Sequence, residues 1–333
     1  MSMSVSNIPT PPIRRNALRD QFVLWGVLAF VIVGMVGAAA ATGWQDTWNQ
    51  IKGLSAAQIC ILLSLSAANY LLRGLRWHAF VRRLGLPLRM GQNMRHFLGG
   101  FAMTITPGRL GELIRMRWIA REAHVPFERS APLVLVDRAA DLAAMALILA
   151  ISLATSTRGI VGGVPVTILA LGGAWVATRP KLMSFMATLG HKATGRGARL
   201  FAKIRRAART LAIFSHGGTW GVALVLGLFG WAAEGLAFYL LLAWMGADVT
   251  LSMAVAIFVF SALAGGLTGA PGGMGGAEAA MIALLSLEGV SFDIALAATA
   301  VIRLTTLWFA ILIGVIVFPI AEKSSLKRVQ DVE

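Results

Sequence analysis

The sequence predicts an all-α polytopic membrane protein with about six spanning helices and two re-entrant helical hairpins, arranged as an inverted repeat. Of its 333 residues, 57% are hydrophobic and only 14% are charged, whereas about a quarter of the residues of a soluble domain are charged. Basic residues alternate between rich and poor segments along the chain, as they do in the loops of membrane proteins. Two Pro-Gly breaks, each followed by glycine and a carboxylate, interrupt apolar segments in matching places.

Six apolar segments have the length that a membrane-spanning helix needs, which is about 20 residues. The first of them is too long for the apolar core of a signal peptide and lacks a clean cleavage site, so we expect a retained span. A very apolar soluble protein is the alternative, and segments this long and apolar disfavour it. The predicted spans cover roughly residues 22–43, 54–72, 131–154, 160–177, 219–244 and 293–318.

The number of lysines and arginines alternates in the segments that separate the six spans. Taken from the N-terminus, the counts are 3, 1, 11, 1, 9, 0 and 3. Because basic loops prefer the cytoplasm, six crossings with both termini inside fit this pattern. We therefore expect residues 1–21 and 319–333 to be cytoplasmic tails and residues 22–318 to form a single transmembrane domain.

The alternation requires that regions 97–122 and 251–289 each enter and leave the membrane on the same side. The apolar arm 97–106 is too short to span, and the stretch 251–268 ends in Gly and Pro before another short arm, 277–287. Both regions fit re-entrant hairpins, whose irregular backbone is tolerated only inside protein or beside a wet cavity. Surface loops with amphipathic helices are the alternative, which fits the first region better than the second.

The hairpins divide the chain into two units of the same order: span, hairpin, span. The units cover about residues 54–154 and 219–318, and the charge pattern starts them from opposite sides of the membrane. The span 160–177 supplies the odd crossing that inverts the second unit. Inverted repeats with interrupted helices indicate a transport site near the middle of the bilayer.

The linker 179–216 is basic, and residues 196–214 within it have the periodicity of an amphipathic helix. With a net charge of +15, this predicts a helix on the anionic cytoplasmic surface of the bilayer. A calmodulin-like partner is the less favoured alternative. The basic residues form no nucleic-acid-binding motif, so no nucleic-acid partner is expected. Cys60 is the one cysteine, which excludes an intrachain disulfide.

The two Pro-Gly breaks provide the first candidate site residues. A helix that begins just after a glycine-rich break presents unpaired N–H groups and the positive end of its dipole, and both attract phosphate or carboxylate. The alternative is that the glycines only permit close helix packing. The following carboxylates cap the new helix or accept a cation. The candidates are Pro107, Gly108, Gly111 and Glu112 at the first break and Pro271, Gly272, Gly273, Gly275 and Glu278 at the second.

Ionisable residues inside the predicted spans are the second group of candidates. Each costs roughly 2.5–3.5 kcal/mol at a helix centre in insertion experiments, so such residues usually pair or face a cavity. Asp137, Arg138 and Asp141 are close in sequence, so a static salt bridge and a functional role both fit them. Glu234 and Arg303 stand alone in their spans, which favours a role in a cavity.

Arg115 follows the first break, and its guanidinium suits bidentate binding of phosphate. For Arg117 and Arg121, which follow in the same segment, basic residues of a cytoplasmic loop are the plainer interpretation. Enzyme motifs are absent from the sequence: Asp137 and Asp141 lack the second aspartate pair that lipid phosphotransferases use, and no HExxH or GxSxG occurs. We therefore expect no catalytic set, no metal site and no cofactor.

Four stretches of the chain resemble the lysylphosphatidylglycerol synthase transmembrane (flippase-like) family: "RGLRWHAFVRRLG", "TPGRLGELIRMRWI", "LVDRAADL" and "GAPGGMGGAEAAM" with "VIRLTTLW". The resemblance covers about residues 54–318 and adds Arg76 to the candidate positions. It implies a bacterial inner-membrane protein that moves or handles a lipid with a polar headgroup. The second motif, "GGMGGAE", has an extra glycine, which shifts Glu278 relative to the family's motif. We expect a stand-alone membrane module without the aminoacyl-transferase domain of the full synthases.

Together these features predict an integral membrane protein that binds and translocates a lipid with an anionic or zwitterionic headgroup. The alternative is an accessory subunit that presents a lipid to an enzyme of lipid modification or of a glycolipid or hopanoid pathway. A small-solute transporter is a third hypothesis, which a cavity sealed from the bilayer would support. Membrane lipids are the expected partners, and a lipid-modifying enzyme joins them under the alternative.

Overall fold

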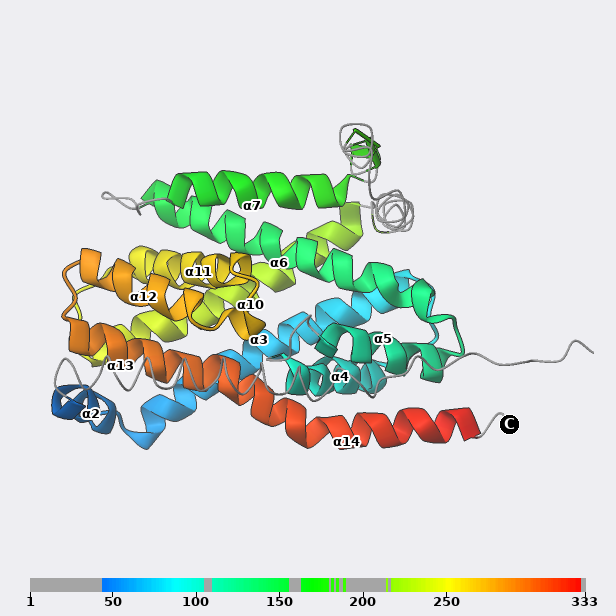
Figure 1. Cartoon of the computed structure of the whole chain (residues 1–333), viewed down its shortest axis with the longest axis horizontal. Helices are drawn as coiled ribbons and strands as arrows, with labels where there is room; N and C mark the ends of the chain where they lie inside the picture. Colours follow the sequence, from blue (N-terminus) through cyan, green and yellow to red (C-terminus); the bar gives the residue numbers. More distant parts are fainter. Residues whose placement is uncertain are drawn as a thin grey trace, which may run out of the picture.

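The computed structural model describes residues 44–104, 110–155, 163–179, 181–182, 184–185, 188–189, 214 and 217–330. These residues form helices joined by turns, and most of the longer helices run along the long axis of the molecule (Figure 1). An all-α fold is therefore confirmed for this part of the chain.

The helices of the first half of the chain and those of the second half occur in a similar order. The first half contains α2 (Trp44–Lys52), α3 (Ala56–Arg83), α4 (Met90–Gly99), the 3₁₀ helix η1 (Gly100–Met103), α5 (Leu110–Ala123), α6 (Phe127–Thr155) and α7 (Gly163–Thr178). The second half contains α10 (Gly217–Trp244), α11 (Leu251–Leu267), the 3₁₀ turn η4 (Pro271–Gly273), α12 (Gly276–Leu287), α13 (Phe292–Arg303), the π-helical segment η5 (Leu304–Trp308) and α14 (Phe309–Gln330).

Side-chain caps fix where two of these helices begin. At the start of α3, the backbone N–H of Gln58 donates to Ser55 Oγ at 3.3 Å, and the backbone N–H of Ser55 donates to Gln58 Oε1 at 2.7 Å. At the start of α11, the backbone N–H of Met253 donates to Thr250 Oγ1 at 3.4 Å. Such caps satisfy N–H groups that have no partner within the helix.

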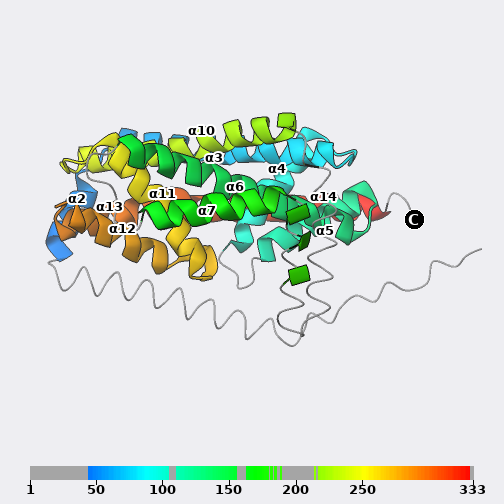
Figure 2. The same cartoon turned by 90° about the horizontal axis from the view of Figure 1, so that it is seen from above.

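The long helices α3 and α10 pack against each other. Around them, α6 packs on α7, α10 and α11, while α4 packs on α3 and α14. The pair α4 and α5 lies toward one end of the long axis, and α11 and α12 lie toward the opposite end (Figures 1 and 2). The helices of the two predicted hairpins therefore lie toward different ends of the bundle.

The buried apolar side chains form two clusters rather than one. One cluster joins α6, α10, α11, α12 and α13 around residues such as Phe238, Ile257 and Leu285. The other joins α3, α4, α5 and α6 around Trp77, Phe97 and other side chains. Members of both clusters line the polar cavity described below.

Three described helices have the length and composition to cross a membrane. They are Ala56–Arg83, Gly217–Trp244 and the continuous segment Phe292–Lys327, and they contain most or all of the predicted spans 54–72, 219–244 and 293–318. The protein is thus a membrane-embedded bundle of helices. Of the other predicted spans, 131–154 lies within the 29-residue α6, most of 160–177 lies within α7, and 22–43 is outside the described residues. The number of crossings stays a prediction.

The second predicted span, 54–72, ends too early, because α3 continues to Arg83. Arg73 and Arg76 therefore lie inside the bundle, where Arg76 has no exposed surface. Arg115, which the charge count also assigned to the basic loop, is 5% exposed. Eight of the eleven basic residues between 73 and 130 remain, so the segment keeps its basic character.

The predicted hairpin arms correspond closely to helices in the second unit, where α11 and α12 match 251–268 and 277–287. In the first unit the arm begins earlier than predicted, since α4 starts at Met90. The predicted amphipathic helix 196–214 lies outside the described residues except for Phe214. That side chain is buried and packs edge-on against Phe80, with ring centroids 5.7 Å apart.

Candidate functional site

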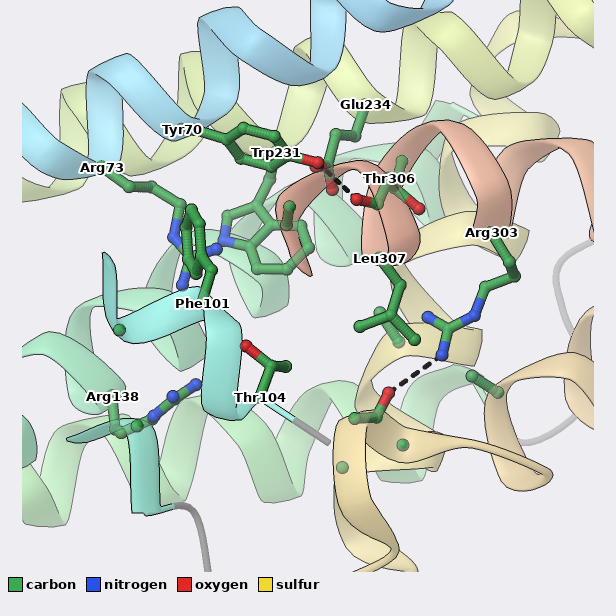
Figure 3. A pocket seen from close by; sticks show the side chains of 18 of the residues that line it. Tyr70, Arg73, Phe101, Thr104, Arg138, Trp231, Glu234, Arg303, Thr306 and Leu307 are labelled. Carbon is green, nitrogen blue, oxygen red and sulfur yellow. Dashed lines mark hydrogen bonds between the residues drawn. The ribbon is translucent and has the colours of Figure 1, made fainter. Parts of the chain in front are cut away.

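A cavity of about 250 Å³ lies where the two predicted units meet (Figure 3). Its walls come from α3, η1, α5 and α6 of the first unit and from α10, α11, α12 and α13 of the second. Figure 3 shows Arg138 and Arg303 on opposite sides of it. The ionisable side chains that line it, apart from Tyr70, are Arg73, Glu112, Arg115, Arg138, Glu234 and Arg303.

On one side of the cavity, Glu112 of α5 pairs with Arg138 of α6. Arg138 Nε donates to Glu112 Oε1 at 2.6 Å, and Nη2 lies against the same oxygen. Arg138 Nη1 is also 3.9 Å from Asp141 Oδ2. The pair ties the helix that follows the first Pro-Gly break to the next helix of its unit.

On the other side, Glu278 of α12 pairs with Arg303 of α13 in the same way. Arg303 Nε donates to Glu278 Oε1 at 2.6 Å, and Arg303 Nη2 donates to the carbonyl oxygen of Gly272 at 2.9 Å (Figure 3). Arg303 thus holds both the start of α12 and the turn that precedes it. In each unit, a carboxylate after the break is bound by an arginine of the following helix.

A buried network behind the cavity joins α3 to α6. Arg76 donates through Nη2 to Asp137 Oδ1 at 2.6 Å and to Asp141 Oδ1 at 2.7 Å. Arg73 Nη2 donates to Asp141 Oδ2 at 2.8 Å, and Trp231 Nε1 donates to Asp141 Oδ1 at 3.2 Å. Both aspartates are at most 5% exposed. Charged hydrogen bonds like these compensate for the cost of burying the ions.

Arg115 is held by aromatic rings instead of carboxylates. Its guanidinium carbon lies 4.4 Å from the ring centroid of Phe97, 5.3 Å from that of Phe101 and 5.7 Å from that of Trp77. Such cation–π contacts are attractive, but they leave hydrogen-bonding capacity unused, and Arg115 Nε has no partner. Arg115 is therefore a buried cation at the cavity without an ion pair among the described residues.

Glu234 of α10 is the counterpart of opposite sign. It is 5% exposed and lines the cavity beside Tyr70, Trp231 and Thr306 (Figure 3). The Tyr70 hydroxyl donates to the carbonyl oxygen of Thr306 in the π-helical segment. Within the part of the chain that the structure describes, Glu234 forms no ion pair.

The glycines at the two breaks permit close packing and a tight turn, and three of them line the cavity. A Cβ on Gly111 would lie 2.3 Å from the carbonyl oxygen of Gly100, so only glycine fits where α5 meets η1. Gly272, at φ 63°, occupies the left-handed region in the turn before α12. Gly111, Gly272 and Gly273 also line the cavity.

The structure brings many of the candidate residues together around this cavity. Lining it are Gly111, Glu112, Arg115, Arg138, Glu234, Gly272, Gly273 and Arg303. Outside the lining, Asp137 and Glu278 hold arginines in place, while Pro271 and Gly275 belong to the turn before α12. Pro107 and Gly108 lie outside the described residues.

The sequence prediction missed Arg73, Tyr70 and Trp231 as cavity residues. Arg73 was assigned to a loop because its charge ends the apolar run. Its position four residues before Trp77 in the quoted motif "RGLRWH" was the available signal, since helical spacing places the two on neighbouring turns. Nothing in the local sequence distinguishes Trp231 from the apolar residues around it.

The fold and the cavity define a class of protein: a membrane-embedded helical bundle that gathers charged side chains in its interior. Residues 23–314 match the family described as the lysylphosphatidylglycerol synthase TM region. The chain belongs to this family, as the resemblance of its motifs indicated.

The relatives of the chain include archaeal membrane proteins. Two UPF0104 membrane proteins of Methanothermobacter thermautotrophicus are 32% identical to it over 101 and 103 residues, and these matches cover about 30% of both chains. The UPF0104 membrane protein MJ1078 of Methanocaldococcus jannaschii is 26% identical over 238 residues, which are 68% of this chain and 97% of the relative. These names describe membrane proteins and specify no reaction or ligand.

Proposed function

We propose that this protein binds a membrane lipid by the anionic phosphate of its headgroup and moves that headgroup across the bilayer through the cavity. The observation that carries the proposal is Arg115, which is 5% exposed and lines the cavity without an ion pair among the described residues. A buried cation without a partner is costly, and an anionic ligand would supply the missing charge. The planar arginine fork suits the oxygens of a phosphate.

The other groups at the cavity support an anionic headgroup. Among the four arginines of the described lining, Arg115 is the one that no carboxylate binds. A volume of about 250 Å³ is smaller than most drug-sized pockets, which span roughly 300–1,000 Å³. It suits a compact headgroup, while the acyl chains stay in the bilayer.

Several matched features support an inverted repeat as the framework for transport. The Glu112–Arg138 and Glu278–Arg303 pairs occupy equivalent places after the two breaks. Gly74 of α3 faces Met94 of α4, where a Cβ would lie 2.5 Å from its sulfur. In the second unit, a Cβ on Gly235 of α10 would lie 3.0 Å from the side chain of Val255 of α11. Each long helix thus approaches the first arm of its own hairpin through a glycine.

The placement of the two hairpins suggests how the cavity would open. The α4–α5 and α11–α12 segments lie toward opposite ends of the bundle (Figure 1), as re-entrant hairpins entering from opposite sides would. In this proposal residues 22–318 form one transport domain, and rocking of the two units exposes the cavity to each side in turn. The charge pattern supports cytoplasmic termini, and we propose the inner membrane of a bacterium as the location.

The test is a lipid translocation assay with purified protein in phosphatidylcholine vesicles. Tail-labelled fluorescent phosphatidylglycerol serves as the probe, and quenching of the outer leaflet reports its movement. We expect translocation by the wild type and at least a tenfold loss in Arg115→Gln. Arg117→Gln is the matched control, because Arg117 lies on the same helix but is exposed. Equal rates in the two variants would refute the role of Arg115.

The alternatives give different results in the same vesicles. Uptake of glycerol 3-phosphate without movement of the labelled lipid would identify a small-solute transporter. Binding of phosphatidylglycerol without translocation would favour the accessory role, in which the protein presents a lipid to a partner enzyme. In that case, deletion of the gene should change lipid products instead of the distribution of lipids between leaflets.

A further inference from the structure

The cavity contains one carboxylate that the proposed headgroup site does not use. Glu234 is 5% exposed and forms no ion pair with any described residue. The other carboxylates around the cavity are all bound by arginines. A single unpaired acid inside a membrane protein needs a partner, and carboxylates in such places often carry protons in pumps and transporters.

The described helices that pack against α10 offer Glu234 no free cation to pair with. The titratable groups that interact electrostatically with Glu234 are Tyr70 and Arg73 of α3, Asp141 of α6 and Arg303 of α13. Helix α11 has no ionisable residue. Arg73 is bound to Asp141, and Arg303 is bound to Glu278 and to a backbone carbonyl oxygen. Both nearby arginines are therefore engaged elsewhere, and a proton can neutralise Glu234 without breaking either interaction.

The charges of the described residues in the cavity and its network balance when Glu234 is ionised. Five arginines then face five carboxylates. An anionic phosphodiester that enters this balanced cluster adds an unmatched negative charge close to Glu234. If Glu234 is protonated, the cluster carries one positive charge and the phosphodiester restores neutrality. The residues counted are Arg73, Arg76, Arg115, Arg138, Arg303, Glu112, Asp137, Asp141, Glu234 and Glu278.

We infer that Glu234 is a proton-binding site and that one proton binds together with each anionic headgroup. The inference rests on the proposed function and gives it a source of energy. When the headgroup enters, a hydronium ion gives its proton to a carboxylate oxygen of Glu234 and leaves a water molecule: one O–H bond breaks and one forms. When the headgroup leaves, the proton returns to water as hydronium. A proton gradient across the membrane then drives the headgroup in the direction in which protons flow.

The linkage between the two ligands determines the pH dependence of binding. If protonation of Glu234 strengthens binding of the anion, the anion strengthens binding of the proton by the same factor. Affinity for the lipid is therefore highest at low pH and falls as pH rises. Coupling to one proton limits the fall to about tenfold per pH unit, because the proton concentration changes by that factor.

Binding of short-chain phosphatidylglycerol to the purified protein in neutral detergent, between about pH 5 and pH 9, tests the linkage. We expect the affinity of the wild type to fall by up to about tenfold per pH unit over part of this range. Glu234→Gln, which mimics the protonated acid, should bind with the wild-type affinity at low pH and keep it at high pH. Asp248→Asn is the control, because Asp248 is an exposed carboxylate in the α10–α11 turn, and it should behave as the wild type.

The outcomes separate this inference from the function on which it rests. Lipid binding by the wild type that does not change with pH would overturn the proton site and leave the lipid function intact. A pH dependence that persists in Glu234→Gln would also overturn it. Absence of phosphatidylglycerol binding at every pH would overturn both proposals.

A second measurement distinguishes a proton from a sodium ion. Wild-type protein in vesicles should move labelled phosphatidylglycerol faster when a pH gradient is imposed at zero membrane potential, and Glu234→Gln should not respond to the gradient. Replacement of sodium by choline at constant pH should have no effect. A response to sodium in place of the pH gradient would assign the site to a metal cation and overturn the proton assignment.

Discussion

Replacement of Arg76 by methionine tests whether the buried network between α3 and α6 holds the bundle together. The substitution keeps much of the volume and removes the guanidinium that binds Asp137 at 2.6 Å and Asp141 at 2.7 Å. Asp141 keeps its bonds to Arg73 and Trp231, whereas Asp137, which is 3% exposed, loses its arginine. Leaving a buried charge uncompensated costs about 3–5 kcal/mol, so we expect the free energy of unfolding to fall by about that amount.

A double-mutant cycle in mixed micelles checks the origin of this loss. Arg76→Met, Asp137→Leu and the double variant are unfolded with increasing denaturing detergent and followed by circular dichroism. Because replacing both members of a buried pair by apolar residues is often nearly neutral, the double variant should be more stable than Arg76→Met. The reasoning is refuted if Arg76→Met loses less than about 1 kcal/mol, or if the effects of the two single substitutions simply add.

Three further substitutions test local features of the fold, each by the same unfolding measurement. Gly111→Ala should destabilise the protein by about 1–3 kcal/mol, because its Cβ would lie 2.3 Å from a backbone carbonyl oxygen of η1. Gly91→Ala is the control and should leave the stability unchanged, since a Cβ there meets nothing within 4 Å. Equal effects of the two substitutions would contradict the close approach at Gly111. Gly275→Ala should cost about 1–2 kcal/mol, since its φ of 81° lies in the left-handed region, and an unchanged stability would show that the turn relaxes. Glu322→Gln should lose about 1 kcal/mol, since both carboxylate oxygens accept hydrogen bonds from side chains of α5, and no loss would show that this contact between α5 and α14 is weak.

The sequence was sufficient to predict the helical class, the bounds of the two helices in the second predicted hairpin and several residues that meet at the cavity. These features have local signals: apolar length, Pro-Gly breaks, and charges inside apolar segments. The extra glycine in the second motif obscured whether Glu278 corresponds to Glu112 of the first motif. The structure supports this correspondence, because Glu278 binds Arg303 as Glu112 binds Arg138. An ion pair between residues 25 or 26 positions apart cannot be read from local periodicity.

Arg73 shows why the true end of α3 and the buried arginines could not be predicted from the sequence. Hydropathy ends a span at the first charge, but α3 continues because Arg73 and Arg76 find aspartates on α6. Only the packing of α3 against α6 supplies those partners. The cost of burying an arginine thus depends on a helix about 60 residues later in the chain, which no single-segment rule includes.

The π-helical segment Leu304–Trp308 has a consequence for how α13 and α14 are aligned. A π-helical turn contains one residue more than an α-helical turn, and each α-helical residue advances the direction of its side chain by about 100°. The extra residue therefore determines how the side chains before the segment are oriented relative to those after it. Before the segment, Arg303 lines the cavity. After it, Gly314 fits against the backbone of Ala102, where a Cβ would lie 2.1 Å from the Ala102 nitrogen. If the same residues formed an ordinary α-helix, the face that carries Gly314 would turn by about 100° relative to the face that carries Arg303, even though both residues would still be present.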